Sequence, residues 1–112
     1  MEIKEFTHGN YVTLMPQGDL DANSSMMMDE TIQAKIDAGI FQLHIDCTGL
    51  RYISSAGLGV FISFMDELSV NGGKFVFSGM TDNIAKVFQL LGLEQLMVIV
   101  KTSADAEKAF QS

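Results

Sequence analysis

Residues 41–59 read FQLHIDCTGLRYISSAGLG and carry the clearest structural signal in the chain. In the first part, apolar Phe41, Leu43 and Ile45 alternate with polar residues, which is the period of a β-strand with one buried face and one wetter face. In the last part, two serines and two glycines lead into an apolar helical pattern that starts at Gly57. The stretch therefore predicts a strand, a loop and a helix, the repeating unit of an α/β protein.

Upstream, the sequence predicts a hairpin followed by a helix. A two-residue link, Gly9-Asn10, joins β-rich runs at residues 3–8 and 11–15, which is typical of two antiparallel strands. The run from residue 24 to residue 37 then carries apolar residues at a spacing of four and ends before Gly39. That spacing indicates an amphipathic helix.

Downstream, strands and helices alternate. After the helix that starts at Gly57, the patterns predict a strand at 74–78, a helix at 81–91, a strand at 97–100 and a helix at 102–110. The order is ββαβαβαβα. Such alternation requires parallel strands with right-handed crossovers, to which the hairpin adds an antiparallel strand. We predict an α/β fold, α+β by some conventions, with a mixed sheet and helices mainly on one face.

Length and composition limit the classes of function. A chain of 112 residues fits a single domain over 1–112, and no apolar run approaches the ~20 residues of a membrane span. The formal charge of −7 repels nucleic acid and anionic lipid surfaces, so we expect neither as a partner. The only cysteine is Cys47, and the first residues do not resemble a secretory signal, so we expect a cytoplasmic protein.

The end of the loop from Asp46 to Gly57 is the candidate site. Functional loops of open α/β sheets lie beyond the carboxyl ends of parallel strands, where helix N-termini converge. One of the two hydroxyls, Ser54 or Ser55, can cap the following helix and leave the other exposed. A phosphate there would gain about 0.3 to 2 kcal/mol from the helix dipole. The same residues also fit a purely structural role, in which the serines are only caps and the glycines only permit close packing.

Four segments resemble the STAS family, whose best-known members are bacterial anti-sigma factor antagonists. They are Gly18-Asp19-Leu20-Asp21, Ile45-Asp46-Cys47-Thr48-Gly49-Leu50, Ile53-Ser54-Ser55-Ala56-Gly57-Leu58-Gly59 and Leu90-Leu91-Gly92-Leu93, and the resemblance covers nearly the whole chain. Alignment of the Gly-Leu-Gly of the family loop places the phosphorylated serine on Ser55, with Ser54 as the alternative acceptor.

The resemblance implies a protein that catalyses nothing and needs no cofactor. Its unphosphorylated form would bind an anti-sigma factor that is also a serine kinase, phosphorylation would release that partner, and a phosphatase would reset the cycle. Here Ser54 replaces the family aspartate before the acceptor, and Ala56 replaces the hydroxyl after it, which leaves the identity of the partner open. The residues expected to bind the partner are Asp21, Ser54, Ser55, Ala56, Gly57 and Leu58.

Two other functions compete with this one. The chain has the aspartates and the lysine of a receiver-like domain phosphorylated on aspartate, namely Asp46, Asp19, Asp21 and Lys101, but receivers begin with strand and helix in alternation. Alternatively, the chain is a STAS module that binds a small ligand or a scaffold partner without phosphorylation.

The remaining notable residues have ordinary structural interpretations. His8 and His44 have no Cys, His or carboxylate at metal-ligand spacing, so we expect a surface or strand position and no metal site. Cys47 is expected to be buried. The three methionines 26–28 suit core filling, or an adaptable binding surface.

Overall fold

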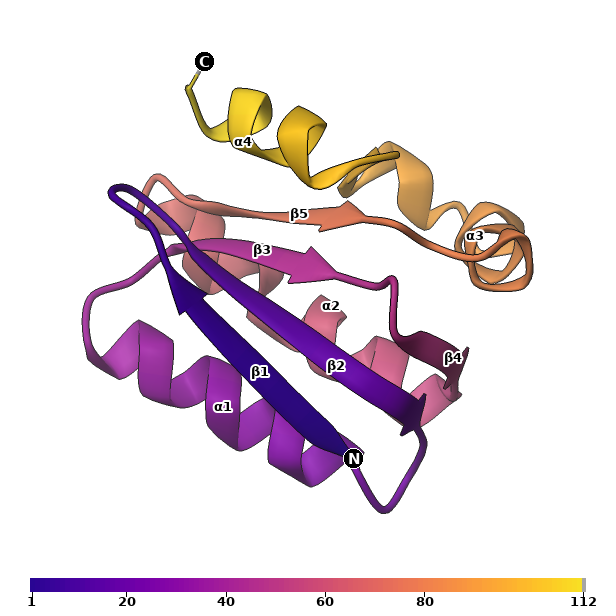
Figure 1. Ribbon diagram of the computed structural model, residues 1–112. Coiled ribbons are helices and arrows are strands. Elements are labelled where there is room, and N and C mark those ends of the chain that lie inside the picture. Colours follow the sequence, from indigo (N-terminus) through magenta and orange to yellow (C-terminus); the bar gives the residue numbers. More distant parts are fainter. Residues whose placement is uncertain (112) are drawn as a thin grey trace.

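A mixed sheet of six strands forms the centre of the protein in a computed structural model that describes residues 1–111. Five strands follow the order β1-β2-β3-β5-β6, and β4 pairs with the far end of β2 (Figure 1). The first two strands are antiparallel and all other pairs are parallel. The strands are β1 (Glu2–Thr7), β2 (Val12–Leu20), β3 (Gln42–Asp46), β4 (Leu50–Ile53), β5 (Lys74–Ser78) and β6 (Val98–Val100).

The helices cover the two faces of the sheet unequally. Their bounds are α1 (Ser25–Asp37), α2 (Ser55–Val70), α3 (Asp82–Leu90) and α4 (Ser103–Gln111), with a short 3-10 helix η1 (Leu93–Gln95). Helices α1, α2 and α3 contribute to one large core, whereas α4 packs on the opposite face against β3, β5 and β6 (Figure 1). The predicted mixed fold with helices mainly on one face is confirmed. No helix within residues 1–111 is long and apolar enough to cross a membrane.

Strand β4 lies where the sequence predicted only a loop. It pairs with the last residues of β2, and the register shifts between Gly18 and Asp19. Strand β2 itself continues past Pro16, which we had placed after the end of that strand. Pro16 falls between the part of β2 that pairs with β3 and the part that pairs with β4, and such a break tolerates a proline. The structure therefore adds one strand to the predicted order.

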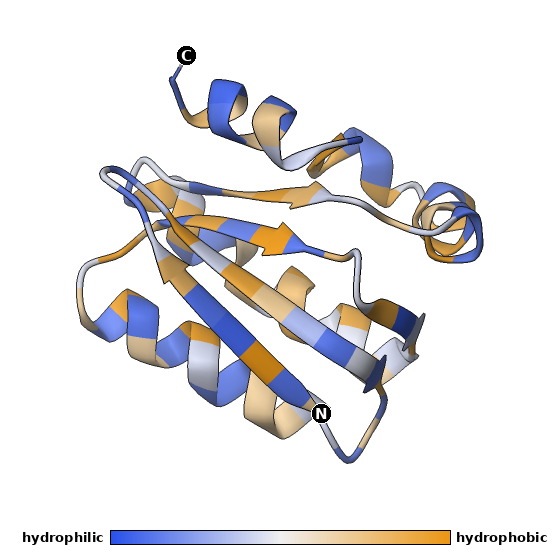
Figure 2. Ribbon diagram, viewed as in Figure 1, coloured by the Kyte–Doolittle hydropathy of each residue, from blue (hydrophilic) through white to orange (hydrophobic). Residues whose placement is uncertain are grey.

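The main core lies between the sheet and helices α1, α2 and α3. Its centre is a group of aromatic rings in which Phe61 contacts Phe77 edge to face, with the ring centroids 5.1 Å apart, and Phe77 contacts Phe88 at 5.5 Å. Figure 2 shows apolar residues along the central strands β2, β3 and β5 that face this core. Each buried ring removes enough apolar surface from water to contribute roughly 1.5 to 3 kcal/mol.

The second face of β3 is buried as well, so the prediction of a wetter face was wrong. His44 is 2% exposed and Asp46 is 5% exposed. Helix α4 covers them, because Ala106 and Phe110 lie four residues apart on one side of the helix and pack with Tyr11 against this face. The buried side chains of His44 and Asp46 require hydrogen-bond partners, which β2, β5 and α4 provide.

Candidate functional site

Ser54 begins α2 as its N-cap. Its backbone is extended, with φ −90° and ψ 171°, and its Oγ accepts a hydrogen bond of 3.1 Å from the N–H of Gly57. The N–H of Ser54 donates in turn to the carbonyl oxygen of Leu20 at 2.9 Å. Ser54 is therefore fixed from both sides, by the first turn of α2 and by the end of β2.

Ser55 is the first residue of α2, and its side chain is exposed. Within residues 1–111 its hydroxyl has no hydrogen-bond partner. The N–H groups of Ser55 and Ala56 belong to the first helical turn and have no acceptor inside the helix. No acidic residue lies in this turn. A phosphate on Ser55 would thus meet backbone donors and the positive end of the helix dipole without a carboxylate of the same turn.

Gly57 and Leu58 support the loop from inside. Both are buried, and Leu58 is only 5% exposed. A Cβ on Gly57 would come within 2.8 Å of Leu20 Cγ and 2.9 Å of its carbonyl oxygen, so only glycine allows α2 to start this close to β2. Of the residues expected to bind the partner, Ser55 and Ala56 lie on the surface, whereas Gly57 and Leu58 shape the loop beneath them.

Asp21 lies next to this loop because Leu20 is bonded to Ser54. Its Oδ1 accepts hydrogen bonds from the N–H groups of Asn23 and Ser24, both at 3.0 Å, and from the Ser24 hydroxyl at 3.1 Å. The bonds from Ser24 are the main reason why the pKa of Asp21 is lowered, with the Asn23 bond adding to the shift. The structure thus places a carboxylate with a lowered pKa beside the serine pair.

A shallow hollow of about 500 Å³ adjoins the loop, and its wall includes Asp19, Asp21, Met27 and Arg51. Arg51 Nε lies 3.6 Å from Asp19 Oδ1. The sequence did not predict a role for Arg51, because it lies on β4, a strand that the sequence patterns do not reveal. The methionine run is divided: Met28 is in the core, whereas Met26 is 69% exposed.

Asp46 anchors the start of the loop. Its Oδ1 accepts bonds from the N–H of Thr48 at 3.0 Å and from the Thr48 hydroxyl at 2.7 Å, and its Oδ2 accepts from Ser103 Oγ at 3.4 Å. A receiver-like acceptor would need an accessible carboxylate at this position. Both oxygens of Asp46 are engaged and the side chain is buried, so this geometry does not support the receiver-like alternative.

Cys47 is buried, as the sequence predicted. Burial, together with the charge of Asp46, raises the pKa of its thiol to about 12. The thiol therefore stays protonated and has no part in the chemistry of the loop.

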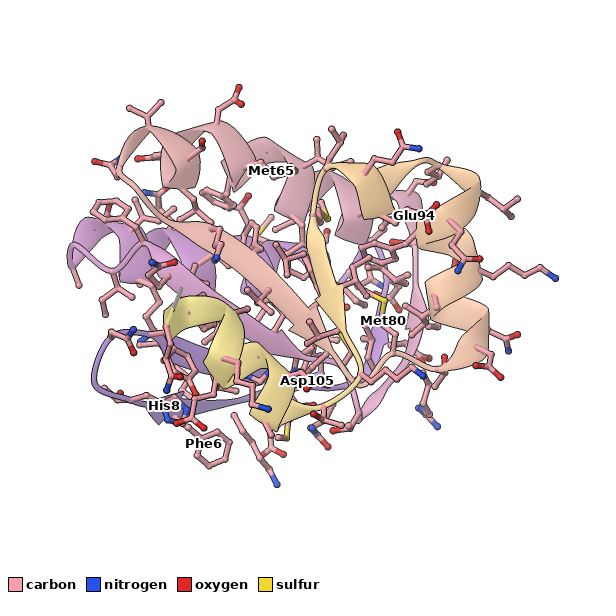
Figure 3. All side chains as sticks on the ribbon, turned by 90° about the horizontal axis from the view of Figure 1, so that it is seen from above. Phe6, His8, Met65, Met80, Glu94 and Asp105 are labelled. Atoms are coloured by element: carbon pink, nitrogen blue, oxygen red, sulfur yellow. The ribbon has the colours of Figure 1, made fainter. Side chains whose placement is uncertain are left out.

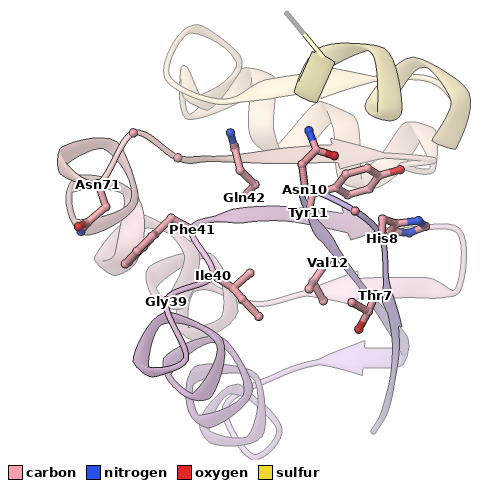
Figure 4. Close-up of a pocket in the computed structure, with 13 residues that line it drawn as sticks. Thr7, His8, Asn10, Tyr11, Val12, Gly39, Ile40, Phe41, Gln42 and Asn71 are labelled. Carbon is pink, nitrogen blue, oxygen red and sulfur yellow. The ribbon is translucent and has the colours of Figure 1, made fainter.

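A second hollow, of about 450 Å³, lies at the other end of the parallel strands (Figure 4). The turn between β1 and β2 and the loops that precede β3 and β5 form its wall, including Asn10, Phe41 and Gln42. It is separate from the serine loop, which follows the carboxyl ends of the strands.

Comparison with known proteins agrees with this architecture. A family model described as "STAS domain" matches residues 3–106. An anti-sigma-B factor antagonist of Listeria monocytogenes is 29% identical over 100 residues, which cover 88% of this chain and 86% of the relative.

Solved structures share the fold. The crystal structure of an anti-sigma factor antagonist from Mycobacterium paratuberculosis matches with a TM-score of 0.90 and 19% identity, over 99% of this chain and 94% of the other. The Bacillus cell fate determinant SpoIIAA in its phosphorylated form matches with a TM-score of 0.75 and 22% identity, over 96% of this chain and 98% of the other.

Proposed function

The chain belongs to the STAS domain family, and on that premise we propose that it is an anti-sigma factor antagonist controlled by phosphorylation of Ser55. The relative from Listeria monocytogenes, which aligns over 86% of its own length, is named an anti-sigma-B factor antagonist. The protein would act by binding rather than by catalysis. Its partners would be an anti-sigma factor that is also a serine kinase, and a phosphatase, all in the cytoplasm.

The observation that carries the proposal is the different environment of the two serines. Ser54 uses its Oγ to cap α2, whereas Ser55 is exposed and has a free hydroxyl within the described chain. A kinase can reach Ser55 without disturbing the fold. The Oγ of Ser54 is instead engaged by the Gly57 N–H, so a kinase would have to break this cap to reach the hydroxyl, at a cost typical of a lost cap, about 0.5 to 2 kcal/mol. This difference favours Ser55 over Ser54 as the acceptor.

Phosphorylation would change the charge of the contact surface. A phosphoserine adds about 1.5 to 2 negative charges and three acceptor oxygens. Asp21 already makes this surface anionic, and the chain carries a formal charge of −7. A partner matched to the unphosphorylated surface would meet a concentrated negative charge after phosphorylation, and its binding would weaken.

Binding to the anti-sigma factor of the same genome, measured by titration calorimetry, tests the proposal. We expect Ser55→Ala to bind as tightly as the wild type and Ser55→Asp to bind at least about tenfold more weakly, which corresponds to ~1.4 kcal/mol. Ser69→Asp is the matched control, because it adds the same charge to an exposed site near the other end of α2. It should bind like the wild type.

Two results would contradict this proposal. Equal binding by Ser55→Ala and Ser55→Asp would contradict the switch and favour a STAS module that binds its partner without phosphorylation. If Ser54→Ala no longer incorporates phosphate while Ser55→Ala still does, the acceptor is Ser54 and not Ser55.

A further inference from the structure

A chain of four polar side chains crosses the sheet on the face covered by α4. His8 Nε2 lies 3.0 Å from Thr13 Oγ1, Thr13 Oγ1 lies 2.9 Å from His44 Nδ1, and His44 Nε2 lies 2.6 Å from Ser78 Oγ. We call these residues, His8, Thr13, His44 and Ser78, the histidine chain. It runs from an exposed imidazole in the β1–β2 turn to a buried one on β3.

The exposed end of the histidine chain also contacts α4 through stacked rings. Tyr11 stacks on His8, with centroids 4.2 Å apart, and on Phe110 of α4, with centroids 4.5 Å apart. Asn10 Nδ2 donates to the carbonyl oxygen of Phe110 at 3.1 Å. Figure 3 shows His8 and Phe6 beside α4 in the view from above. Tyr11 therefore connects the ring of His8 to α4.

The hydroxyl of Thr13 limits how many imidazoles of the histidine chain can be protonated while its hydrogen bonds stay intact. It has one hydrogen to donate and lies between two imidazole nitrogens. With one protonated ring, Thr13 accepts from that ring and donates to the other, and all three hydrogen bonds of the histidine chain can form. With both rings protonated, both donate to Thr13, and its own hydrogen loses its acceptor. Two positive rings joined by one hydroxyl also repel each other.

The charges around His44 do not offset the cost of protonating both imidazoles. Burial is the main cause that lowers the pKa of His44, His8 lowers it further, and only Asp46 acts in the opposite direction. The carboxylate of Asp46 is already engaged by Thr48 and Ser103. Other titratable or charged groups on the elements of this face include Glu2 and Lys4 on β1, Tyr11 on the turn, Lys74 on β5, Lys101 after β6, and Asp105, Glu107 and Lys108 on α4.

We propose that the histidine chain makes the docking of α4 sensitive to pH. The contact stays intact while at most one of the two imidazoles, His8 or His44, is positively charged. When both are charged, the rings of His8, Tyr11 and Phe110 separate and α4 loosens. The fold thus contains a proton-responsive contact on the face opposite the main core, carried by residues other than the serine pair.

Titration of the imidazole nitrogens by NMR tests this proposal in the full chain, whose two histidines make assignment direct. We expect the pKa of His44 to lie below its ordinary value, and the protection of the Phe110 amide from hydrogen exchange to fall as His44 takes up its proton. In His8→Phe, which keeps an aromatic ring for Tyr11 but has no titrating nitrogen, the His44 curve should move to higher pH. Thr13→Val, which removes the bridging hydroxyl, should alter the titration of both rings.

Lys108→Gln is the control, because it removes a positive charge from α4 outside the histidine chain. It should leave the His44 curve nearly unchanged. An unchanged His44 curve in His8→Phe, or Phe110 protection that does not follow the protonation of His44 in the wild type, would overturn the proposal. If Thr13→Val does not fold, His8→Phe decides alone, because His8 is exposed.

Discussion

The N–H of Ser54 donates a hydrogen bond of 2.9 Å to the carbonyl oxygen of Leu20. This bond joins the start of α2 to the last residue of β2, and it places Asp21 beside the serine pair although the two are more than 30 residues apart in the chain. The candidate switch is therefore built where two loops meet, and its geometry depends on both.

Removal of the cap tests the structural role of Ser54. We expect Ser54→Ala to lower the free energy of unfolding by about 0.5 to 2 kcal/mol, because the Gly57 N–H loses its acceptor. Ser55→Ala should change it by less than about 0.5 kcal/mol, since an exposed side chain without a partner is removed. Urea denaturation monitored by circular dichroism measures both. Equal losses in the two variants would show that the serines share the capping role.

The two glycines of α2 make a matched pair. A Cβ on Gly57 would overlap Leu20, so Gly57→Ala should destabilise the protein by about 1 to 3 kcal/mol and displace the start of α2. A Cβ on Gly59 would point into open space, and Gly59→Ala should stabilise the protein by up to about 1 kcal/mol through helix propensity. Thermal unfolding of both variants shows whether each substitution raises or lowers the stability. Stabilisation by both would mean that α2 does not pack as closely on β2 as described.

The ionisation of Asp21 contributes a pH-dependent part of the stability. Because the folded-state pKa of Asp21 is lowered, its contribution is complete above the pKa of the unfolded chain, ~3.9, and is lost as the pH falls through the folded-state value. Asp21→Asn should therefore be less stable than the wild type near pH 7, and the difference should shrink in acid. Urea denaturation at a series of pH values measures it. A difference that stays constant with pH would contradict the assignment.

Cys47 should be unreactive in the native protein. Its thiol is buried and has a pKa of about 12, so iodoacetamide at pH 8 should leave it unmodified. Complete labelling is expected once the protein is unfolded in urea. Mass spectrometry of the two samples checks this, and rapid labelling of the native protein would show that the end of β3 opens to solvent.

Much of the fold follows from local sequence patterns, and the exceptions share one cause. The helical period through Leu58 and Phe61 predicted α2, and the spacing of Thr102 and Asp105 predicted the cap of α4, whose hydrogen bond is present at 3.1 Å. Strand β4 was missed because it is four residues long and pairs with β2, a contact that so short a run of sequence does not reveal. The burial of His44 was missed for the same reason, because it depends on α4, a helix more than 50 residues away.

The candidate site also rests partly on local sequence and partly on contacts between distant segments. The serine pair, the glycine and Asp21 were identified from their order in the chain and from family resemblance. Which serine caps the helix could not be decided, because Ser54 and Ser55 are both good caps. The bond from Ser54 to Leu20 sets the direction of the backbone there. Ser54 therefore becomes the cap, and Ser55 is left exposed.

The position of the phosphate in protein purified from its host tests the central claim most directly. Intact mass followed by peptide mapping distinguishes the two serines, and samples from several growth conditions show whether the phosphorylated fraction changes. We predict one phosphoryl group per chain, on Ser55, with Ser54 unmodified. Phosphate on Ser54 in place of Ser55, or no phosphate under any growth condition, would contradict the proposed switch.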